Sequence, residues 1–183
     1  ANGEKIASVN GILTVPAGVY DVSSDINGVI YGSKMMHISN ASDKDYTWGQ
    51  NVHLEKGKSY KFKVKISAER KSTLYYVAIR KVEQIDSNNR RYVYVKSTHF
   101  KDNRKIDWEL ADNGIYDYTF SFTHDSESGE YFLAIYPQER AEMYIAEPNL
   151  YDVDKPDVNI IKNADFTDGL NNWIENWYGI PKD

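Results

Sequence analysis

Two short stretches of the sequence combine flat aromatic rings with planar polar groups. "DYTWGQN" places Tyr46, Trp48 and Gln50 within seven residues, and "RRYVYVKS" places Tyr92 and Tyr94 next to arginine. An aromatic face can cover the apolar C–H side of a pyranose, while amide and guanidinium groups pair with its hydroxyls. Both stretches are therefore candidates for sugar binding. Packing of the same rings inside the fold is the alternative.

Two further candidates follow from strand alternation. In "LYYVAIRK", Tyr76 and Arg80 lie on the face opposite to Val77 and Ile79, so they line a surface if the aliphatic pair is core. Pairing of Arg80 with a surface acid, a contact of little energetic worth, is the alternative for that residue. Trp108, in the polar stretch "RKIDWELAD", is the ring that we expect to be most exposed. It either caps the fold or stacks on a ligand.

Catalytic and metal-binding chemistry lack the patterns that they need. The 27 Asp and Glu residues fall mostly in turns and form no recognisable catalytic pair. No G-x-S-x-G motif supports a serine nucleophile, and the four histidines are scattered without metal-ligand spacing. The absence of cysteine rules out disulfides, thiolate metal sites and a cysteine nucleophile. We therefore expect neither an enzyme nor a cofactor.

Charge and hydropathy argue against two kinds of partner. The net charge of -5 is mild and the basic residues are spread along the chain, so we expect no nucleic-acid surface. No apolar run reaches about 18 residues, so we expect no membrane span. The 15 tyrosines outnumber the 6 phenylalanines. Tyrosine offers an apolar face with a hydroxyl that can stay in water, although it also simply favours strands.

The elements that must position these residues are short strands. Apolar and polar residues alternate in "SYKFKVKIS" and in "DYTFSFTH", and turn sequences such as "DNG" separate further β-branched and aromatic runs. Roughly ten strands at intervals of about 10–15 residues predict an all-β chain folded as an antiparallel β-sandwich or jelly roll.

Three stretches resemble, in order, the motifs of the carbohydrate-binding modules of families 4, 9, 16 and 22, which have a galactose-binding-like jelly-roll fold. They are "WGQNVHLEKGKSYKFKVKISAE", "IYDYTFSFTHDSESGEYFLAIYPQ" and "AEMYIAEPNLYDVD", and with their surroundings they cover about residues 34–154. The resemblance implies a non-catalytic module that binds polysaccharide or oligosaccharide. It further implies a bacterial protein, secreted or at the cell surface, that contains other modules.

The resemblance also implies a cleft in which two aromatic rings grip the sugar. Trp48 or Tyr46 matches the first ring, and Tyr94 or Tyr92 matches the second. The residues that would complete the cleft are a hydroxyl partner on the first strand and a residue that stands where the family often has an acid: Gln50 and Tyr136.

Calcium binding is implied only in part. The family often holds a structural calcium ion with acids of its first and closing strands. In the closing strand of this sequence, "AEPNLYD", Glu147 alone remains of those acids. We expect no cofactor, and Glu147 is the remaining candidate ligand for calcium.

Residues 159–173, "NIIKNADFTDGLNNW", resemble the first strand of such a module, although they lie near the end of the chain. We predict that residues 1–154 form the module and that residues 155–158 are a linker. Residues 159–183 would then be the first strand of a following, truncated module. Docking of this strand back onto the first sandwich, as a permuted element, is the alternative.

The favoured hypothesis is a polysaccharide-binding module with a slight preference for α-glucans, such as starch or maltooligosaccharide, over β-glucan or xylan. The tyrosine-rich, cysteine-free character resembles starch-adherence modules of gut anaerobes. The rival is a structural or adhesion sandwich, a spacer of a cell-surface protein without a sugar site. It predicts that Trp48, Tyr92, Tyr94 and Trp108 are buried or scattered. An enzyme, the third hypothesis, needs a pair of cleft carboxylates.

Overall fold

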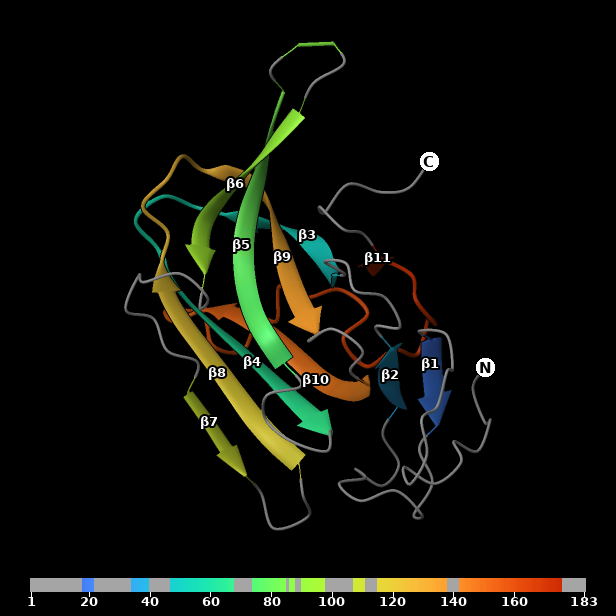
Figure 1. Ribbon diagram of the computed structural model, residues 1–183. Coiled ribbons are helices and arrows are strands. Elements are labelled where there is room, and N and C mark those ends of the chain that lie inside the picture. Colours follow the sequence, from blue (N-terminus) through green and yellow to red (C-terminus); the bar gives the residue numbers. More distant parts are fainter. Residues whose placement is uncertain are drawn as a thin grey trace.

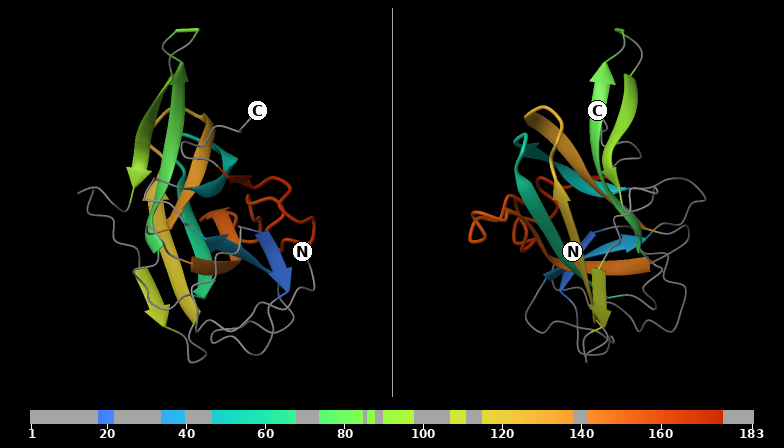
Figure 2. Two further views of the ribbon diagram at one scale, coloured as in Figure 1. Left: turned by 45° about the vertical axis from the view of Figure 1, so that its right-hand side comes forward. Right: turned by 90° about the vertical axis from the view of Figure 1, so that its left-hand side faces the viewer.

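The computed structural model describes residues 18–21, 34–39, 47–67, 74–84, 86–87, 90–97, 107–110, 115–137 and 142–175. These residues form strands and turns, and none of them is helical. The strands build two antiparallel sheets that pack face to face (Figure 1, Figure 2). The predicted all-β sandwich is confirmed. No helix that could cross a membrane occurs among the described residues.

One sheet has six strands and the other has five. The six-stranded sheet has the order β1 (Gly18–Asp21), β2 (Lys34–Ser39), β10 (Glu142–Asp152), β4 (Ser59–Ser67), β8 (Ile115–Thr123) and β7 (Asp107–Leu110). The five-stranded sheet has the order β11 (Ile174–Glu175), β3 (Trp48–Leu54), β9 (Gly129–Pro137), β5 (Leu74–Gln84) and β6 (Arg90–Ser97).

The connections are those of a jelly roll. From β2 to β5, and again from β8 to β10, successive strands alternate between the two sheets, and β5 and β6 form a hairpin within one sheet. The returning strands β9 and β10 lie beside β3 and β2, which entered the fold first. Returns of this kind across two sheets are the paired Greek keys of the jelly-roll fold.

The core lies between the sheets and follows the period of two that the sequence predicts. On β4, Tyr60, Phe62, Val64 and Ile66 are buried, whereas Lys63 between them is exposed. Strand β8, which pairs with β4, contributes Tyr118, Phe120 and Phe122 to the same core. These two strands therefore present an apolar face to the opposite sheet and a more polar face outward.

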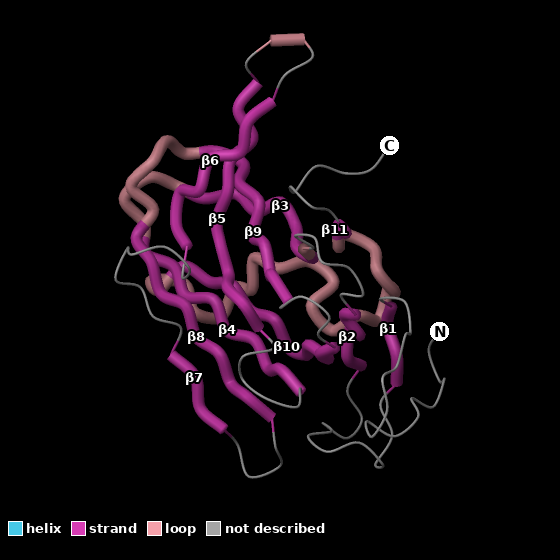
Figure 3. The backbone as a smooth tube through the Cα atoms, in the orientation of Figure 1, coloured by secondary structure: helices cyan, strands magenta, loops and turns pink. Residues whose placement is uncertain are grey.

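The chain after β10 docks onto this sandwich. Figure 3 shows the segment running as a long loop from β10 to β11, which is the edge strand next to β3. Ile161, Phe166 and Trp173 belong to the same core as the two sheets, and Phe166 is fully buried. Ile174 of β11 pairs with Gly49 of β3.

This placement bears on the predicted domain boundary. The described part of residues 159–183, which ends at residue 175, packs into the core of the first sandwich. The physical reason is apolar burial, because Ile161, Phe166 and Trp173 find their partners in this core. The docking alternative is the arrangement that the structure has. Residues 176–183 lie outside the described residues.

Candidate functional site

The outer face of the five-stranded sheet carries three of the residues that the sequence singled out, Tyr76, Arg80 and Tyr136. On β5, Val77 and Ile79 point into the core, as strand alternation predicts. Tyr76 and Arg80 therefore lie on the opposite, outer face, and Tyr76 packs there with Ala78 in a second apolar cluster. The two residues thus share one face of β5, and their role in binding stays a prediction.

Strand register brings β9 residues onto the same face. Tyr136 is opposite Tyr76, and Phe132 is opposite Arg80. The rings of Tyr76 and Tyr136 stack with centroids 3.9 Å apart and planes 19° from parallel. The guanidinium carbon of Arg80 lies 5.1 Å from the centre of the Tyr136 ring and 5.7 Å from that of Phe132. We call these four residues the Tyr76 cluster.

A guanidinium held over aromatic rings is a stable arrangement in a partly dehydrated site, because the ring faces attract the cation. The cluster is closed in this structure. Tyr76, Arg80 and Tyr136 are 4%, 2% and 2% exposed, and each makes contacts beyond those within the cluster. No ring face is free to stack on a ligand without a rearrangement that uncovers it.

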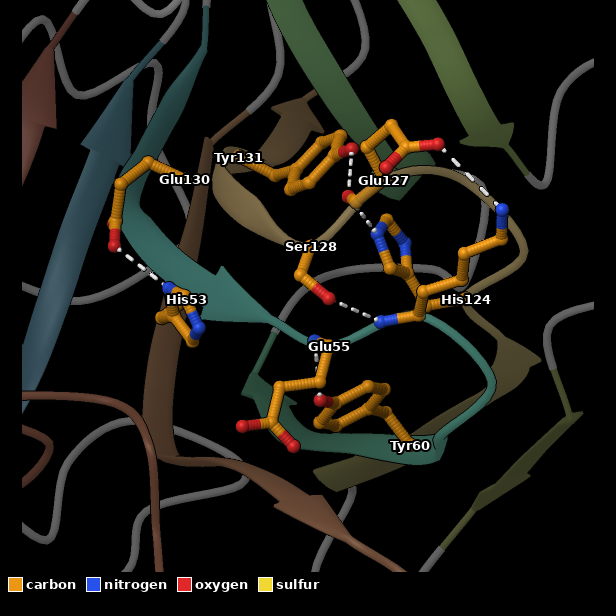
Figure 4. Close-up of polar contacts among 9 residues, drawn as sticks. His53, Glu55, Tyr60, His124, Glu127, Ser128, Glu130 and Tyr131 are labelled. Atoms are coloured by element: carbon orange, nitrogen blue, oxygen red, sulfur yellow. Dashed lines mark hydrogen bonds and ion pairs between the residues drawn. The ribbon is translucent and has the colours of Figure 1, made fainter.

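Polar groups on β3 and β9 border the Tyr76 cluster. Asn51 is exposed and lies opposite Phe132 in the strand register. One step further along the pair, His53 is opposite Glu130, and its Nδ1 lies 3.1 Å from the Glu130 carboxylate (Figure 4). The outer face therefore combines covered rings with an exposed amide, an imidazole and a carboxylate. These groups could bind hydroxyls once the rings were open.

Trp48 and Gln50 lie on the other side of the sheet, which corrects their predicted role. Trp48 is 3% exposed and belongs to the core between the sheets, so its face is unavailable to a sugar. Gln50 is also buried, and both ends of its amide bond to the main chain of Lys162. The reason is the strand period, because Trp48 and Gln50 share a face with Val52 and Leu54, which are core residues.

The remaining predicted residues are placed only by their backbones or lie outside the described residues. Strand β6 pairs Tyr94 with Arg80 and Tyr92 with Val82. Trp108 is on β7, opposite Tyr118 of β8. Tyr46 lies outside the described residues.

Glu147, the candidate calcium ligand, is exposed and has a φ of 51°. It sits where the pairing of β10 with β4 is interrupted between Ala146 and Asn149. Among the described residues, His, Cys, Asp and Glu side chains form no group of three or more that could hold a metal ion. The structure thus places Glu147 on a β-bulge, and calcium binding by Glu147 stays a prediction.

A second polar cluster, at the end of the sandwich, holds two turns together (Figure 4). The Tyr131 hydroxyl donates to the main-chain oxygen of Glu127 at 2.5 Å, and His124 Nε2 lies 2.9 Å from the same oxygen. The Tyr60 hydroxyl accepts a hydrogen bond from the Glu55 amide at 2.9 Å. Burial raises the pKa of Tyr131. Since the partners are main-chain atoms, these contacts fix turns. They also give a structural role to two of the tyrosines, Tyr60 and Tyr131.

Sequence reasoning missed Phe132 as a member of the site. The signal was present, since Phe132 and Tyr136 are four residues apart on β9 and therefore share a face. The stretch "YFLAIY" is apolar on both faces, so alternation alone does not separate its inner from its outer side.

The fold and this site define a jelly-roll β-sandwich with an aromatic–guanidinium cluster on the outer face of one sheet. No protein-family model and no curated protein matches the chain. A solved structure described as "PbXyn10C CBM APO" is 12% identical, with a TM-score of 0.47 over 80% of this chain and 83% of that chain. Another, described as "CBM4 structure and function", is 16% identical, with a TM-score of 0.37 over 68% and 73%. No residue role is carried over from either.

Proposed function

We propose that the chain is a non-catalytic carbohydrate-binding module that binds polysaccharide on the outer face of its five-stranded sheet. The observation that carries this proposal is the Tyr76 cluster. Three residues selected from the sequence, Tyr76, Arg80 and Tyr136, come from two strands and meet on one face. The three sequence motifs that resemble carbohydrate-binding modules, all within one jelly roll, support the same function.

The chemistry of the face suits a sugar chain. Aromatic rings supply flat apolar surfaces, and Arg80 and the exposed Asn51 supply donors for hydroxyls. A ligand must first uncover the rings, so part of its binding free energy is spent on opening the site. We therefore expect weak binding, with a Kd on the order of 0.1–1 mM.

The finer proposal concerns the sugar and its setting. We propose α-glucan chains as the preferred ligand, with β-glucan and xylan as the alternatives. We also propose that the module works outside the cell, or at its surface, as part of a larger multimodular protein. A chain that holds polysaccharide close to other modules raises the effective concentration of substrate for them.

A spacer or adhesion sandwich without a sugar site is the second candidate. The observation in its favour is the burial of Trp48 in the core, together with the covered faces of Tyr76 and Tyr136. A spacer needs only a stable sandwich, whereas a module needs the Tyr76 cluster to open.

Isothermal titration with maltooligosaccharide, xylooligosaccharide and β-glucan oligosaccharide separates the two candidates. We expect binding that weakens at least about tenfold in Tyr136→Ala and several-fold in Asn51→Ala. Lys63→Ala is the matched control, because Lys63 is exposed on the outer face of the other sheet. Thermal melts of each variant distinguish lost binding from lost folding. Absence of heat with every sugar in the panel would leave the spacer as the function.

A further inference from the structure

The sandwich contains a built site for a peptide rich in turns, which its own residues 159–175 fill. The buried side chain of Gln50 binds the main chain of Lys162 at both atoms: Gln50 Nε2 donates to the Lys162 oxygen at 3.0 Å, and the Lys162 amide donates to Gln50 Oε1 at 2.8 Å. The side-chain amide of Gln50 thus makes the pair of main-chain hydrogen bonds that a neighbouring strand would make. Because Gln50 bonds only to main-chain atoms, it fixes the register of the peptide without selecting the side chain of residue 162.

Main-chain contacts with β10 hold the beginning of the same peptide. The Ile160 amide donates to the Leu150 oxygen at 2.7 Å. The Asn159 side chain accepts from the Leu150 amide at 3.1 Å and donates to the Pro148 oxygen at 3.1 Å. The Asn159 side chain therefore pairs with one main-chain donor and one main-chain acceptor of β10. This pairing makes the site selective for asparagine at this position.

Three apolar anchors then enter the core: Ile161, Phe166 and Trp173 are 5%, 0% and 6% exposed. Phe166 and Trp173 also contact each other, with ring centroids 5.4 Å apart. A peptide that lacked these side chains would leave a cavity among the core residues. The anchors therefore supply most of the binding free energy, and the polar contacts supply register.

The segment is largely self-contained between its anchors. Asn163 donates to the main-chain oxygens of Gly169 and Asn171, and its Oδ1 accepts from the Asp168 amide. The Trp173 indole donates to the Asn163 oxygen at 3.1 Å. These hydrogen bonds join residues of the segment to one another, so the segment can leave the sandwich without breaking them.

The connection between the sandwich and the segment is exposed. All residues from 153 to 158 are exposed, and the two valines at its ends, Val153 and Val158, are 46% and 57% exposed. Its described hydrogen bonds are those of a turn and of its junction with the sheet, such as Lys155 N to Asp152 O and Val153 N to Ser59 O. Changing the path of these residues therefore leaves the core contacts of the segment intact.

We propose that residues 159–175 are a transferable peptide and that two copies of the chain can exchange it. Each copy would insert its segment into the acceptor site beside Gln50 of the other. An exchanged pair keeps every contact described above, so it differs from the closed single chain chiefly in the path of residues 153–158. The closed chain dominates in dilute solution because its tether holds the segment at an effective concentration of about millimolar.

Cutting the tether, residues 153–158, in the 183-residue chain tests the acceptor site. A site-specific protease sequence inserted after Asp154 is cleaved, and the nicked protein is incubated with a labelled peptide of residues 155–175. We expect the cleaved fragment to stay bound and the labelled peptide to replace it in a saturable manner, as measured by fluorescence anisotropy. Loss of the fragment with no rebinding of peptide would overturn the proposal.

Two peptide variants make the test specific. Phe166→Ala removes the fully buried anchor and should weaken binding by more than about 100-fold. Lys162→Ala is the matched control, since that side chain is exposed and only its main chain bonds to Gln50. Equal binding of the Phe166→Ala and Lys162→Ala peptides would show that the peptide is held elsewhere.

Shortening the tether tests exchange between copies. With residues 153–158 deleted, Asp152 joins Asn159 directly, so the chain cannot reverse to bring Ile160 to Leu150 while Tyr151 and Asp152 stay paired with β4. We expect this variant to be a dimer by light scattering and to keep the Trp173 environment of the closed chain. A folded monomer whose residues 159–175 exchange their amide hydrogens rapidly would refute exchange.

Discussion

At the scale of single residues, Asn163 organises the docked segment. Its φ of 50° lies in the left-handed region, which asparagine tolerates better than most residues. In that conformation its side chain bonds to Asp168, Gly169 and Asn171. The same residue's main-chain oxygen receives the Trp173 indole. One asparagine thus connects the turn to an apolar anchor.

We therefore expect Asn163→Ala to lower the free energy of unfolding by about 2–3 kcal/mol, from lost hydrogen bonds and from a strained φ. Urea denaturation measures the loss. Asn163→Gly should recover only the conformational part, about 1 kcal/mol. Lys162→Ala is the neighbouring control and should leave the midpoint unchanged. Full stability of Asn163→Ala would mean that these hydrogen bonds contribute little.

His37 makes stability depend on pH. It is fully buried and stacks on Tyr144 with ring centroids 4.7 Å apart. Burial disfavours the charged ring and lowers the pKa of His37 to about 4, against 6.5 in the unfolded chain. Below pH 6.5 the unfolded state binds a proton that the folded state does not, so stability should fall as the pH drops from about 6.5 to 4.

The size of this loss is at most about 3.5 kcal/mol, since each unit of pKa difference corresponds to about 1.4 kcal/mol. Urea midpoints measured between pH 4 and pH 8 provide the test, with His37→Gln as the comparison. The difference between the two proteins should narrow toward low pH. Parallel curves would show that another group causes the dependence.

The residue scale also shows what sequence reasoning could reach. The alternation that correctly placed Tyr76 and Arg80 also applies to "WGQNVHL", where Trp48 and Gln50 share the core face of Val52 and Leu54. That inference was available from the sequence. The partner of Gln50 was not, because Lys162 lies 112 positions away and contributes only main-chain atoms. A polar residue on a core face is the signal that such a partner exists.

At the scale of elements, β3 depends on a glycine. Gly49 lies between β11 and β9, paired with Ile174 on one side and Ala134 on the other. A Cβ built at Gly49 would lie 1.8 Å from the main-chain oxygen of Leu133. No rotamer relieves this clash, because the obstacle is backbone. The strands must therefore separate if any side chain is present.

We expect Gly49→Ala to destabilise the protein by about 3 kcal/mol or more, since overpacking against a fixed backbone forces the strands apart. Hydrogen exchange should locate the damage, with faster exchange in β3, β9 and β11 before other strands. Gly57→Ala is a useful contrast. A Cβ at Gly57 has open space, but its φ of 86° is strained for alanine, so we expect a loss of about 1 kcal/mol.

The strands were predictable, and their pairing was not. The alternation of β4 and β8 is a local property of "SYKFKVKIS" and "YDYTFSFT", and it marks both the strand and its buried face. The neighbours of β10 are β2 and β4, and both lie far from β10 in the sequence. The sequence of β10 alone does not specify these partners, because strand pairing depends on how the apolar faces of all the strands are buried together.

At the scale of the whole molecule, the docked segment closes the core. The turn at residues 153–158 contains proline and charged residues, a composition that suits a linker as well as a tight reversal. The sequence alone therefore does not distinguish a linker between domains from a turn within one domain. The decisive facts are tertiary: Ile161 and Phe166 belong to the core of both sheets, and β11 continues the five-stranded sheet.

A substitution in this segment should therefore unfold the entire sandwich. Phe166→Ala removes a fully buried ring and should cost about 3–5 kcal/mol. Because Phe166 belongs to the shared core, we expect one cooperative transition at a lower temperature, with hydrogen exchange accelerated in β4 and β9 as well as in the segment. Thr167→Ala, at the exposed neighbouring position, is the control and should change little, since its described bonds go only to Asp165. If the segment were a separate module, Phe166→Ala would leave the melting of β4 and β9 untouched. Accelerated exchange restricted to residues 159–175 would therefore contradict a shared core.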